Sequence, residues 1–347
     1  MALDSLSEHV DLMFLFYTLL HRGFDDVISG TAQPQITKEA LEKVKILIPP
    51  LAQQHRIVAK LDTLFGRSKS TREELERIPR LVERYRSAIL AAAFAGRLTA
   101  DWRQNRPNTA DGKQLLTQLL ASRERKREKR GAWEAFDPPE DFEDLPDSWA
   151  WCPVAALAST VSDGVHKKPD YVEDGVPFLT VRNLTAGPGI IFDGCRFVTK
   201  SDHEEFIKRT NPERGDLLIT KDGTLGVVRA VRTDVPFSIF VSLALVKPID
   251  RSMTDYLELA FSSPQVQEQM VGVGCGLQHI HLKDLRRDLI PIAPAEERGE
   301  IVKRVHSAFA YIDRLESETI RATRLLDRLD QATLAKAFRG ELFEKAS

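Results

Sequence analysis

Two stretches of this chain are copies of one another: ITKEALEKVKILIPPLAQQHRIV at residues 36–58 and IHLKDLRRDLIPIAPAEERGEIV at residues 280–302. They belong to a longer repeat in which residues 29–98 align with residues 273–342 without a gap, and 21 of the 70 paired residues are identical. A repeat constrains the architecture more strongly than a local motif does. Because unrelated sequence separates the copies, the repeat predicts a pseudo-two-fold molecule rather than a solenoid.

Each copy continues into a long predicted helix, at residues 51–95 and 295–339. Seam positions recur along both helices with spacings of four and three, which is the pattern of a coiled coil. Gly96 and Gly340 follow the helices, as a left-handed C-cap prefers. Pro79 lies inside the first helix, where proline costs about 3 kcal/mol or kinks the chain. The predicted seam residues are Ile57, Leu61, Leu64, Leu75, Ile78, Val82, Tyr85, Ile89, Ile301, Val305, Ile312, Leu315, Leu326 and Leu329.

The predicted fold class is α+β: a mixed α/β domain plus two long helices packed as an antiparallel coiled coil. Short β-rich runs separated by turn residues recur between residues 177 and 246, and the repeat adds a predicted strand at residues 44–48 and 289–292. Five segments follow from the repeat: the end of a first domain (1–50), the first helix (51–98), a charged connector (99–144), a complete domain (145–294) and the second helix (295–342).

Composition excludes several classes of protein. No apolar stretch approaches the roughly 20 residues of a membrane span, and the N-terminus lacks the layout of a signal peptide. Cys152, Cys195 and Cys275 are scattered, as expected of reduced packing residues. We therefore expect a cytoplasmic protein. Its net charge of −2 does not by itself indicate a nucleic-acid partner.

No motif predicts a catalytic or metal centre. The sequence Asp-Pro-Pro-Glu at 137–140 resembles the D-P-P-aromatic motif of adenine methyltransferases, but its acidic fourth residue cannot stack on a flipped base. The glycine run at 272–276 lacks the strand–loop–helix context of a nucleotide loop. The eight histidines show no metal-ligand spacing. We expect a protein that is not an enzyme.

Polar loops in residues 145–294 concentrate side chains that can contact DNA bases or phosphates. Residues 208–232 hold six basic and three acidic residues, so a basic strip on a neutral body is predicted. For any one of these residues an ordinary surface loop is the alternative. The basic run at 123–130 is expected to be a solvated helix face, with a contact to the phosphate backbone as the alternative. The predicted DNA contacts are His166, Lys167, Lys168, Arg182, Asn183, Lys221, Asp222, Thr224, Gln278 and His279.

Taken together, these features resemble the specificity (S) subunits of type I restriction-modification enzymes. The resemblance rests on the two repeated stretches with their helix ends, Ala92-Ala-Phe-x-Gly and Ala335-Lys-Ala-Phe-Arg-Gly340, and on Leu145-Pro-Asp-Ser-Trp-x-Trp151. Asp216-Leu-Leu-Ile-Thr-Lys-Asp-Gly223 also resembles a strand of that family. The match covers nearly the whole chain.

The resemblance implies that residues 145–294 form a target recognition domain that reads one half of a bipartite, double-stranded DNA sequence. The two helices would form a rod that sets the spacing of the half-sites and docks methyltransferase (M) subunits, with restriction (R) subunits joining later. S-adenosylmethionine, ATP and Mg would be held only by those partners, and this chain would hold no cofactor or metal.

The sequence departs from the family at its first copy. With an offset of 244, Met1 falls opposite Leu245, so the counterpart of residues 151–244 is expected to be missing. Gln53-Gln54 also replaces the usual Glu-Gln at the helix start. A truncated reading frame, a fragment, and a subunit whose partner supplies the missing half are all consistent with this pattern. The competing function is a silent remnant that acts only as a coiled-coil scaffold without DNA binding, and an independent enzyme ranks third.

Overall fold

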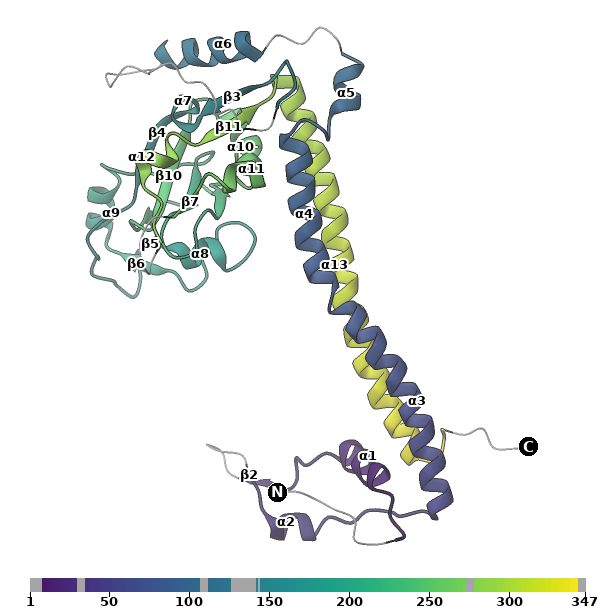
Figure 1. Cartoon of the computed structure of the whole chain (residues 1–347). Helices are drawn as coiled ribbons and strands as arrows, with labels where there is room; N and C mark the ends of the chain where they lie inside the picture. The colour runs from purple at the N-terminus through teal and green to yellow at the C-terminus, as the bar shows by residue number, and fades with distance from the viewer. Residues whose placement is uncertain are drawn as a thin grey trace. The chain divides into compact units, whose positions relative to one another are not determined.

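The computed structural model describes residues 8–29, 35–106, 112–125, 142, 144–272 and 278–342 (Figure 1). The chain divides into two compact units, the smaller comprising Met1–Glu83 with Ile312–Ser347 and the larger comprising Arg84–Tyr311. Each unit has its own hydrophobic core. Within the described residues, no helix combines the length and the apolar character needed to cross a membrane.

The larger unit is built around a four-stranded antiparallel sheet of order β4-β10-β7-β8. A second sheet of order β6-β5-β9 contains one parallel pair, β5 with β9, and β11 pairs with β3. The strands are β3 (Ala150–Pro153), β4 (Ala158–Asp163), β5 (Val176–Leu179), β6 (Arg196–Val198), β7 (Leu217–Thr220), β8 (Val228–Ala230), β9 (Ser238–Ile239), β10 (Leu243–Pro248) and β11 (Leu289–Ile292).

Alternate residues of β7 enter opposite cores, because successive side chains of a strand point to opposite faces of the sheet. Leu217 and Ile219 pack in one cluster, and Leu218 packs in the other. In β10, Ala244 and Val246 belong to the first cluster, while its leucines belong to the second. The sheet is therefore buried on both faces, as its almost continuous apolar strands predict.

Short helices surround these sheets. α10 covers one core face and buries Tyr256, whose hydroxyl donates to the carbonyl of Pro291 in β11 at 2.7 Å. The observed mixture of sheets and segregated helices confirms the predicted α+β class. The short helices of this unit are α5 (Ala100–Gln104), α6 (Gly112–Arg125), α7 (Val154–Leu157), α8 (Val181–Thr185), α9 (Lys200–Phe206), η1 (Arg251–Met253), α10 (Thr254–Phe261), α11 (Pro264–Gln267) and α12 (Leu282–Leu285).

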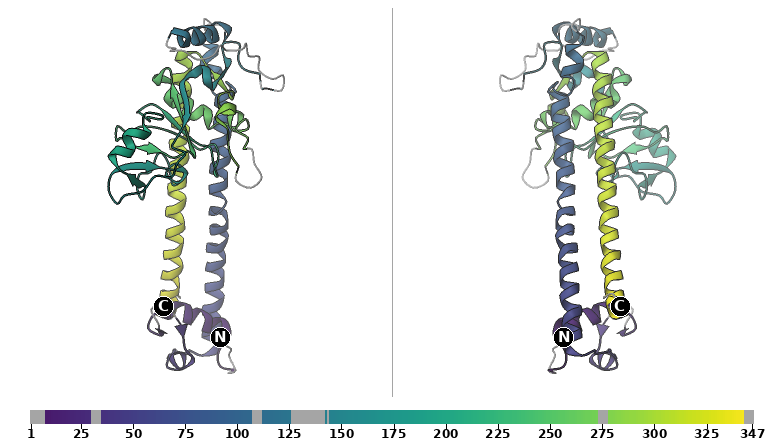
Figure 2. Two further views of the ribbon diagram at one scale, coloured as in Figure 1. Left: turned by 90° about the vertical axis from the view of Figure 1, so that its left-hand side faces the viewer. Right: turned by 90° about the vertical axis from the view of Figure 1, so that its right-hand side faces the viewer.

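The smaller unit contains α1 (Leu12–Arg22), the two-residue strands β1 (Ile28–Ser29) and β2 (Gln35–Ile36), α2 (Lys38–Glu42) and α3 (Leu51–Leu75). α3 lies beside the C-terminal part of α13 (Ala295–Phe338) (Figure 2). Arg72 donates to Asp327 at 2.9 Å and to Asp330 at 3.2 Å across this pair. The cluster formed by α1, α3 and α13 includes Leu61 and Leu334.

The first long helix is interrupted, contrary to the prediction of one helix over 51–95. α3 ends at Leu75, residues 76 and 77 form a turn, and α4 runs over Ile78–Phe94. Pro79 occupies the first turn of α4, where its missing N–H is not needed, whereas in an unbroken helix it would clash with the preceding turn. Thr323 stands at the matching position of α13, which is continuous.

The same contacts recur in the two units, as the repeat requires. In the smaller unit the start of α3 meets the end of α13 through Ile57, Leu61 and Leu334. In the larger unit the start of α13 meets the end of α4 through Ile301, Val305 and Leu90. These three residues are the repeat counterparts of Ile57, Leu61 and Leu334, at the offset of 244. Both helix ends have left-handed glycines, Gly96 with φ 71° and Gly340 with φ 76°, which confirms the predicted caps. The helices pack antiparallel in both units.

The seam prediction is wrong at three positions. Tyr85, Leu315 and Leu329 are 62%, 45% and 56% exposed. The covered stripe of α13 instead follows the 3.6-residue period of a straight α-helix, so a strict 3.5-residue pattern drifts off it. Ile57, Leu61, Val82, Ile301, Val305 and Ile312 are buried as predicted, and Leu64, Leu75, Ile78, Ile89 and Leu326 are partly buried.

The predicted strand at residues 44–48 is also absent. This segment has no regular structure, and Leu47 and Ile48 are 90% and 49% exposed. Its counterpart β11 exists because it pairs with β3, and no described strand pairs with residues 44–48. In the connector, α6 ends at Arg125 and therefore includes the first three residues of the basic run at 123–130. Residues 126–130, most of the acidic stretch 137–144, and Cys275 lie outside the described residues.

Candidate nucleic-acid interface

Three of the predicted loops meet at one end of the main sheet. They follow β4 (residues 163–168), follow β7 (residues 221–224) and precede α12 (residues 278–281). The Lys221 N–H donates to the carbonyl of Ser242, and the Lys221 carbonyl accepts from Ile280 N–H, both at 2.9 Å. Asp222 forms an isolated antiparallel bridge with His279. Backbone pairing therefore joins loops that lie more than 50 residues apart in the sequence.

Asp163 is the centre of this cluster. Its carboxylate is buried and accepts from Arg209 at 2.7 Å and from His166 at 3.2 Å, and the Lys221 ammonium lies 3.4 Å away. Burial opposes ionisation of Asp163, but these hydrogen bonds and the Lys221 charge outweigh it and lower the pKa of the carboxyl. The carboxylate thus holds His166 and Arg209, which are both 58% exposed, in fixed positions.

Lys221 is not a surface lysine, contrary to the prediction that it contacts DNA. Its side chain is 2% exposed, among the largest fully buried side chains, and it lies between Asp163 and Asp222. A buried ammonium must be paired to be tolerated, and these carboxylates supply the pairing. Lys221 therefore supports the loop cluster from beneath.

Asn183 is a second correction. It is 5% exposed, its side-chain oxygen accepts from the Thr180 N–H at 2.8 Å, and its amide donates to the carbonyl of Ile191 at 2.8 Å. The side chain caps α8 and holds the following loop, so it cannot also reach a base. The neighbouring Arg182 is exposed, but among the described residues it makes no side-chain hydrogen bond or ion pair with the Asp163 cluster.

Six predicted residues are exposed and two are partly exposed. Lys167, Lys168 and His166 lie on the loop after β4. Asp222 and His279 are partly exposed and hydrogen-bonded to each other, and the His279 ring meets that of His281 edge-on at 4.9 Å. The remaining exposed residues are Arg182, Thr224 and Gln278. The structure therefore brings together His166, Lys221, Asp222 and His279, and it sets Arg182 and Asn183 apart on α8.

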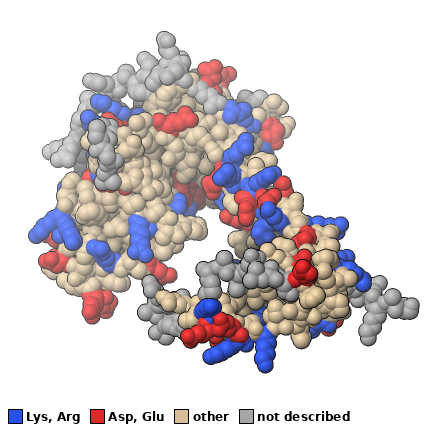
Figure 3. Space-filling view, turned by 60° about the horizontal axis from the view of Figure 1, so that its bottom comes forward, with Lys and Arg blue, Asp and Glu red and all other residues tan. Residues whose placement is uncertain are grey.

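The predicted basic strip at 208–232 is largely neutralised by acidic residues outside it. Arg214 pairs with Asp234 at 2.7 Å, and Arg232 pairs with Asp255 and Glu258. Arg229 donates to the carbonyls of Gly187 and Gly189. Figure 3 likewise shows basic and acidic side chains interspersed over the visible face. Counting charges along the sequence missed these pairings, and it also passed over Arg209 as an individual site residue.

The domain entry, residues 145–151, is anchored by a buried glutamate. Glu297, in the first turn of α13, is fully buried and accepts from Trp149 Nε1 at 2.9 Å and from Thr99 Oγ1 at 2.7 Å, and it also pairs with Arg103. Three parts of the larger unit thus converge on one carboxylate: the end of the first helix, the domain entry and the start of the second helix. Neither Glu297 nor Thr99 was predicted, because each makes contacts about 150 to 200 residues away.

Comparison with known proteins identifies the domain family and the subunits that this chain resembles. Residues 3–80 match the type I restriction modification DNA specificity domain. The specificity subunits of the type I restriction enzymes EcoBI from Escherichia coli and EcoKI from Escherichia coli K12 are 29% and 28% identical over 90% and 94% of this chain. The chain spans 62% and 63% of the length of these two relatives.

Solved structures agree with the fold. A chain of a type I R-M system whose complex assembly was studied superposes with a TM-score of 0.66 at 21% identity, covering 96% of this chain and 73% of that one. The HsdS subunit of Thermoanaerobacter tengcongensis gives a TM-score of 0.53 at 21% identity, covering 96% and 72%. The predicted resemblance is thereby confirmed in both sequence and fold.

Proposed function

We propose that this chain, a relative of the type I restriction enzyme specificity subunits, is a non-catalytic subunit that binds double-stranded DNA through residues 145–294. The observation that carries the proposal is the similarity to specificity subunits over at least 90% of the chain, including this domain. The Asp163 cluster supports it, because side chains held in place before binding lose less freedom when DNA is bound.

Within this proposal the exposed residues divide by chemistry. Lys167 and Lys168 suit phosphate oxygens, which fix position on the duplex but carry no sequence information. Arg209, Gln278 and Arg182 can donate to base edges in the major groove, where each base pair presents a distinct pattern. The buried Lys221 and Asn183 hold loops that present these side chains.

The long helices would bind methyltransferase subunits. Leu81 and Tyr85 are 42% and 62% exposed, and their repeat counterparts Leu325 and Leu329 are 54% and 56% exposed. The spacing of four places each pair on one helix face, and we take these two repeated apolar faces as the surfaces that would contact a partner. Two equivalent faces would accept two copies of one partner. Methylation and cleavage, with S-adenosylmethionine, ATP and Mg, would belong to the methyltransferase and restriction partners.

The test is a gel shift of the chain with a cognate methyltransferase subunit across a salt series. The double variant Lys167→Ala/Lys168→Ala is expected to flatten the slope of log affinity against log salt by about 2 if both lysines contact phosphates. A charge-matched control, Lys38→Ala/Lys43→Ala at α2, which lies outside both the long helices and residues 145–294, should leave the slope unchanged. Absence of DNA binding with the methyltransferase present would favour the scaffold function instead.

A further inference from the structure

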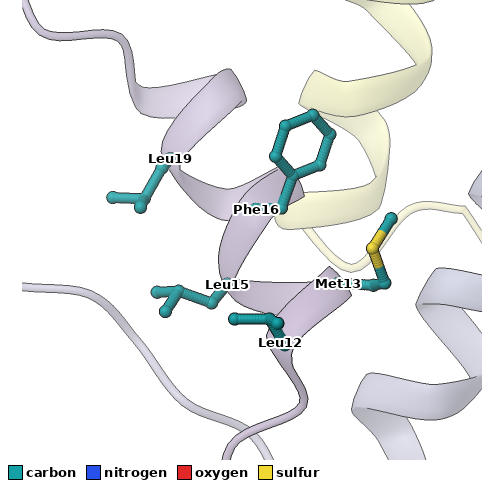
Figure 4. A pocket seen from close by; sticks show the side chains of 5 residues that line it. All are labelled: Leu12, Met13, Leu15, Phe16 and Leu19. Atoms are coloured by element: carbon teal, nitrogen blue, oxygen red, sulfur yellow. The ribbon is translucent and has the colours of Figure 1, made fainter. Parts of the chain in front are cut away.

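Selective recognition needs a few polar side chains held in fixed positions. The open groove on α1, of about 380 Å³, does not supply them, because the side chains that line it are all apolar (Figure 4). They are Leu12, Met13, Leu15, Phe16 and Leu19. Polar side chains fixed by one another lie instead in the loop cluster of the larger unit, around Asp163.

Arg209 is anchored at Asp163 through both its side chain and its backbone segment. Its Nη2 donates to Asp163 Oδ1 at 2.7 Å and lies 3.0 Å from His166 Nε2. The next residue, Thr210, is buried and donates to the Asp163 carbonyl at 2.6 Å. The second carboxylate oxygen of Asp163, Oδ2, faces Lys221 Nζ at 3.4 Å, which leaves Oδ1 for Arg209. The guanidinium is therefore held in place although the Arg209 side chain is 58% exposed.

The remaining donors of Arg209 are available for a ligand. Neither Nε nor Nη1 has a hydrogen-bond partner among the described residues, so the N–H groups on these two nitrogens can still donate. In the major groove guanine presents only acceptors, N7 and O6, whereas adenine and cytosine present an amino donor and thymine presents a methyl group. A side chain that only donates is therefore favoured at guanine.

The charge balance of the cluster favours a base over a phosphate. Arg209 and Lys221 are offset by the carboxylates of Asp163 and Asp222, so the cluster carries no net charge when its histidines are neutral. A phosphate near the Arg209 guanidinium would also approach the negative charge of Asp163, whereas the acceptors of guanine are uncharged. The two exposed lysines on the loop after β4 form no ion pair with any described residue, and they suit phosphates better.

We propose that Arg209 reads one guanine of the DNA target and that Asp163 is the positioning residue that holds its guanidinium for this contact. This assignment rests on the proposed DNA binding and names one side chain and one base for it. The Asp163 side chain is 6% exposed, so it acts through Arg209 and does not touch the base itself. Because Nη2 stays with Asp163, the contact lacks the fork of a bidentate arginine. The preference for guanine is therefore expected near the lower end for such contacts, at about fivefold to tenfold.

The test is selection of duplexes from a random-sequence library by the full chain with a cognate methyltransferase subunit, followed by sequencing of the bound DNA. The parent chain should select a G·C pair at a position where Arg209→Ala loses the preference by about fivefold to tenfold. The other selected positions should stay unchanged. Arg214→Ala is the matched control and should select the parent sequence. Arg214 is 54% exposed, is paired with Asp234 and precedes β7, whereas the cluster lies at the other end of this strand.

The variant Asp163→Asn tests the positioning role. It should weaken the same preference for guanine. The double variant Asp163→Asn/Arg209→Ala should lose no more of this preference than Arg209→Ala alone, because Asp163 acts through Arg209. A role of Asp163 in stability alone would instead make the two losses additive and would spare no selected position. Arg209 is exposed, so its own variant is expected to fold whether or not Asp163→Asn does.

Three outcomes would overturn the assignment of Arg209 while leaving the proposed DNA binding intact. The first is an unchanged set of base preferences in Arg209→Ala, and the second is a preference lost at an A·T pair. The third is an equal loss of affinity for all sequences with a salt slope flatter by about 1, which would identify a phosphate contact. If instead the parent chain selects no sequence with the methyltransferase subunit present, the proposed function itself fails, so the two failures are distinguishable.

Discussion

Asp288 should make the larger unit less stable as the pH rises towards neutrality. It lies between α12 and β11 and is 8% exposed, and its buried Oδ2 has no hydrogen-bond partner among the described residues. Burial, together with the nearby charge of Asp284, raises the pKa of Asp288 from 3.8 to about 7. Removing the ionisable group by Asp288→Asn is therefore a direct test of this buried carboxyl.

The sign follows from proton binding. Between pH 3.8 and 7 the folded state holds a proton on Asp288 that the unfolded state has lost. The free energy of unfolding therefore falls as the pH rises through this interval. A shift of this size is worth about 4 kcal/mol in total, of which about 3 kcal/mol falls between pH 5 and pH 8. At pH 5 the penalty is about 1.7 kcal/mol, and at pH 8 it is almost complete.

Urea unfolding followed by tryptophan fluorescence measures this effect in the right place, because all four tryptophans (Trp102, Trp133, Trp149 and Trp151) lie within residues 84–311. The free-energy difference between Asp288→Asn and the parent chain should grow by about 3 kcal/mol in favour of the variant from pH 5 to pH 8. Comparing the two proteins cancels the histidines, which titrate in both. The exposed Asp193→Asn serves as the matched control. Parallel stability curves for Asp288→Asn and the parent chain would refute the reasoning.

Two further predictions concern buried charges in the larger unit. Lys221→Met should lower the free energy of unfolding by about 2 kcal/mol, because Asp163 loses one partner but keeps Arg209 and His166. In the gel-shift series the salt slope of this variant should match that of the parent chain. A flatter slope would restore Lys221 as a phosphate contact. Glu297→Ala should cost about 3 kcal/mol, because Trp149, Thr99 and Arg103 lose their shared acceptor; a loss below about 1 kcal/mol in tryptophan-monitored unfolding would contradict its role as the anchor of the domain entry.

Much of the frame follows from sequence because its causes are local. The helix period and the two cap glycines depend on residues within a few turns of each other, and the repeat is found by comparing residue identities, so all three could be predicted directly. A kink at Pro79 could also be predicted, since proline removes a hydrogen-bond donor and clashes within its own helix. The seam drifted at Leu315 and Leu329 because a 3.5-residue pattern was extended over α13, which keeps the 3.6-residue period.

The candidate site depended more on tertiary structure. Residue type marked Lys221 and Asn183 as DNA contacts, but burial is set by neighbours distant in sequence, and both proved to hold loops from within. Arg214 and Arg232 of the basic strip form ion pairs with acidic residues that lie outside it, namely Asp234, Asp255 and Glu258.

By itself, the sequence determined that this chain contains one repeated frame with an α+β domain between the copies. It did so because hydrophobic periodicity and repeated residue identities can be recognised in the sequence without knowing which residues are in contact. Only the tertiary structure decided which polar side chains face solvent, and that the Val44–Ile48 stretch does not become a strand. The physical reason is that a strand forms only where a neighbouring strand satisfies its backbone groups. β11 has that neighbour in β3, and residues 44–48 have none among the described residues.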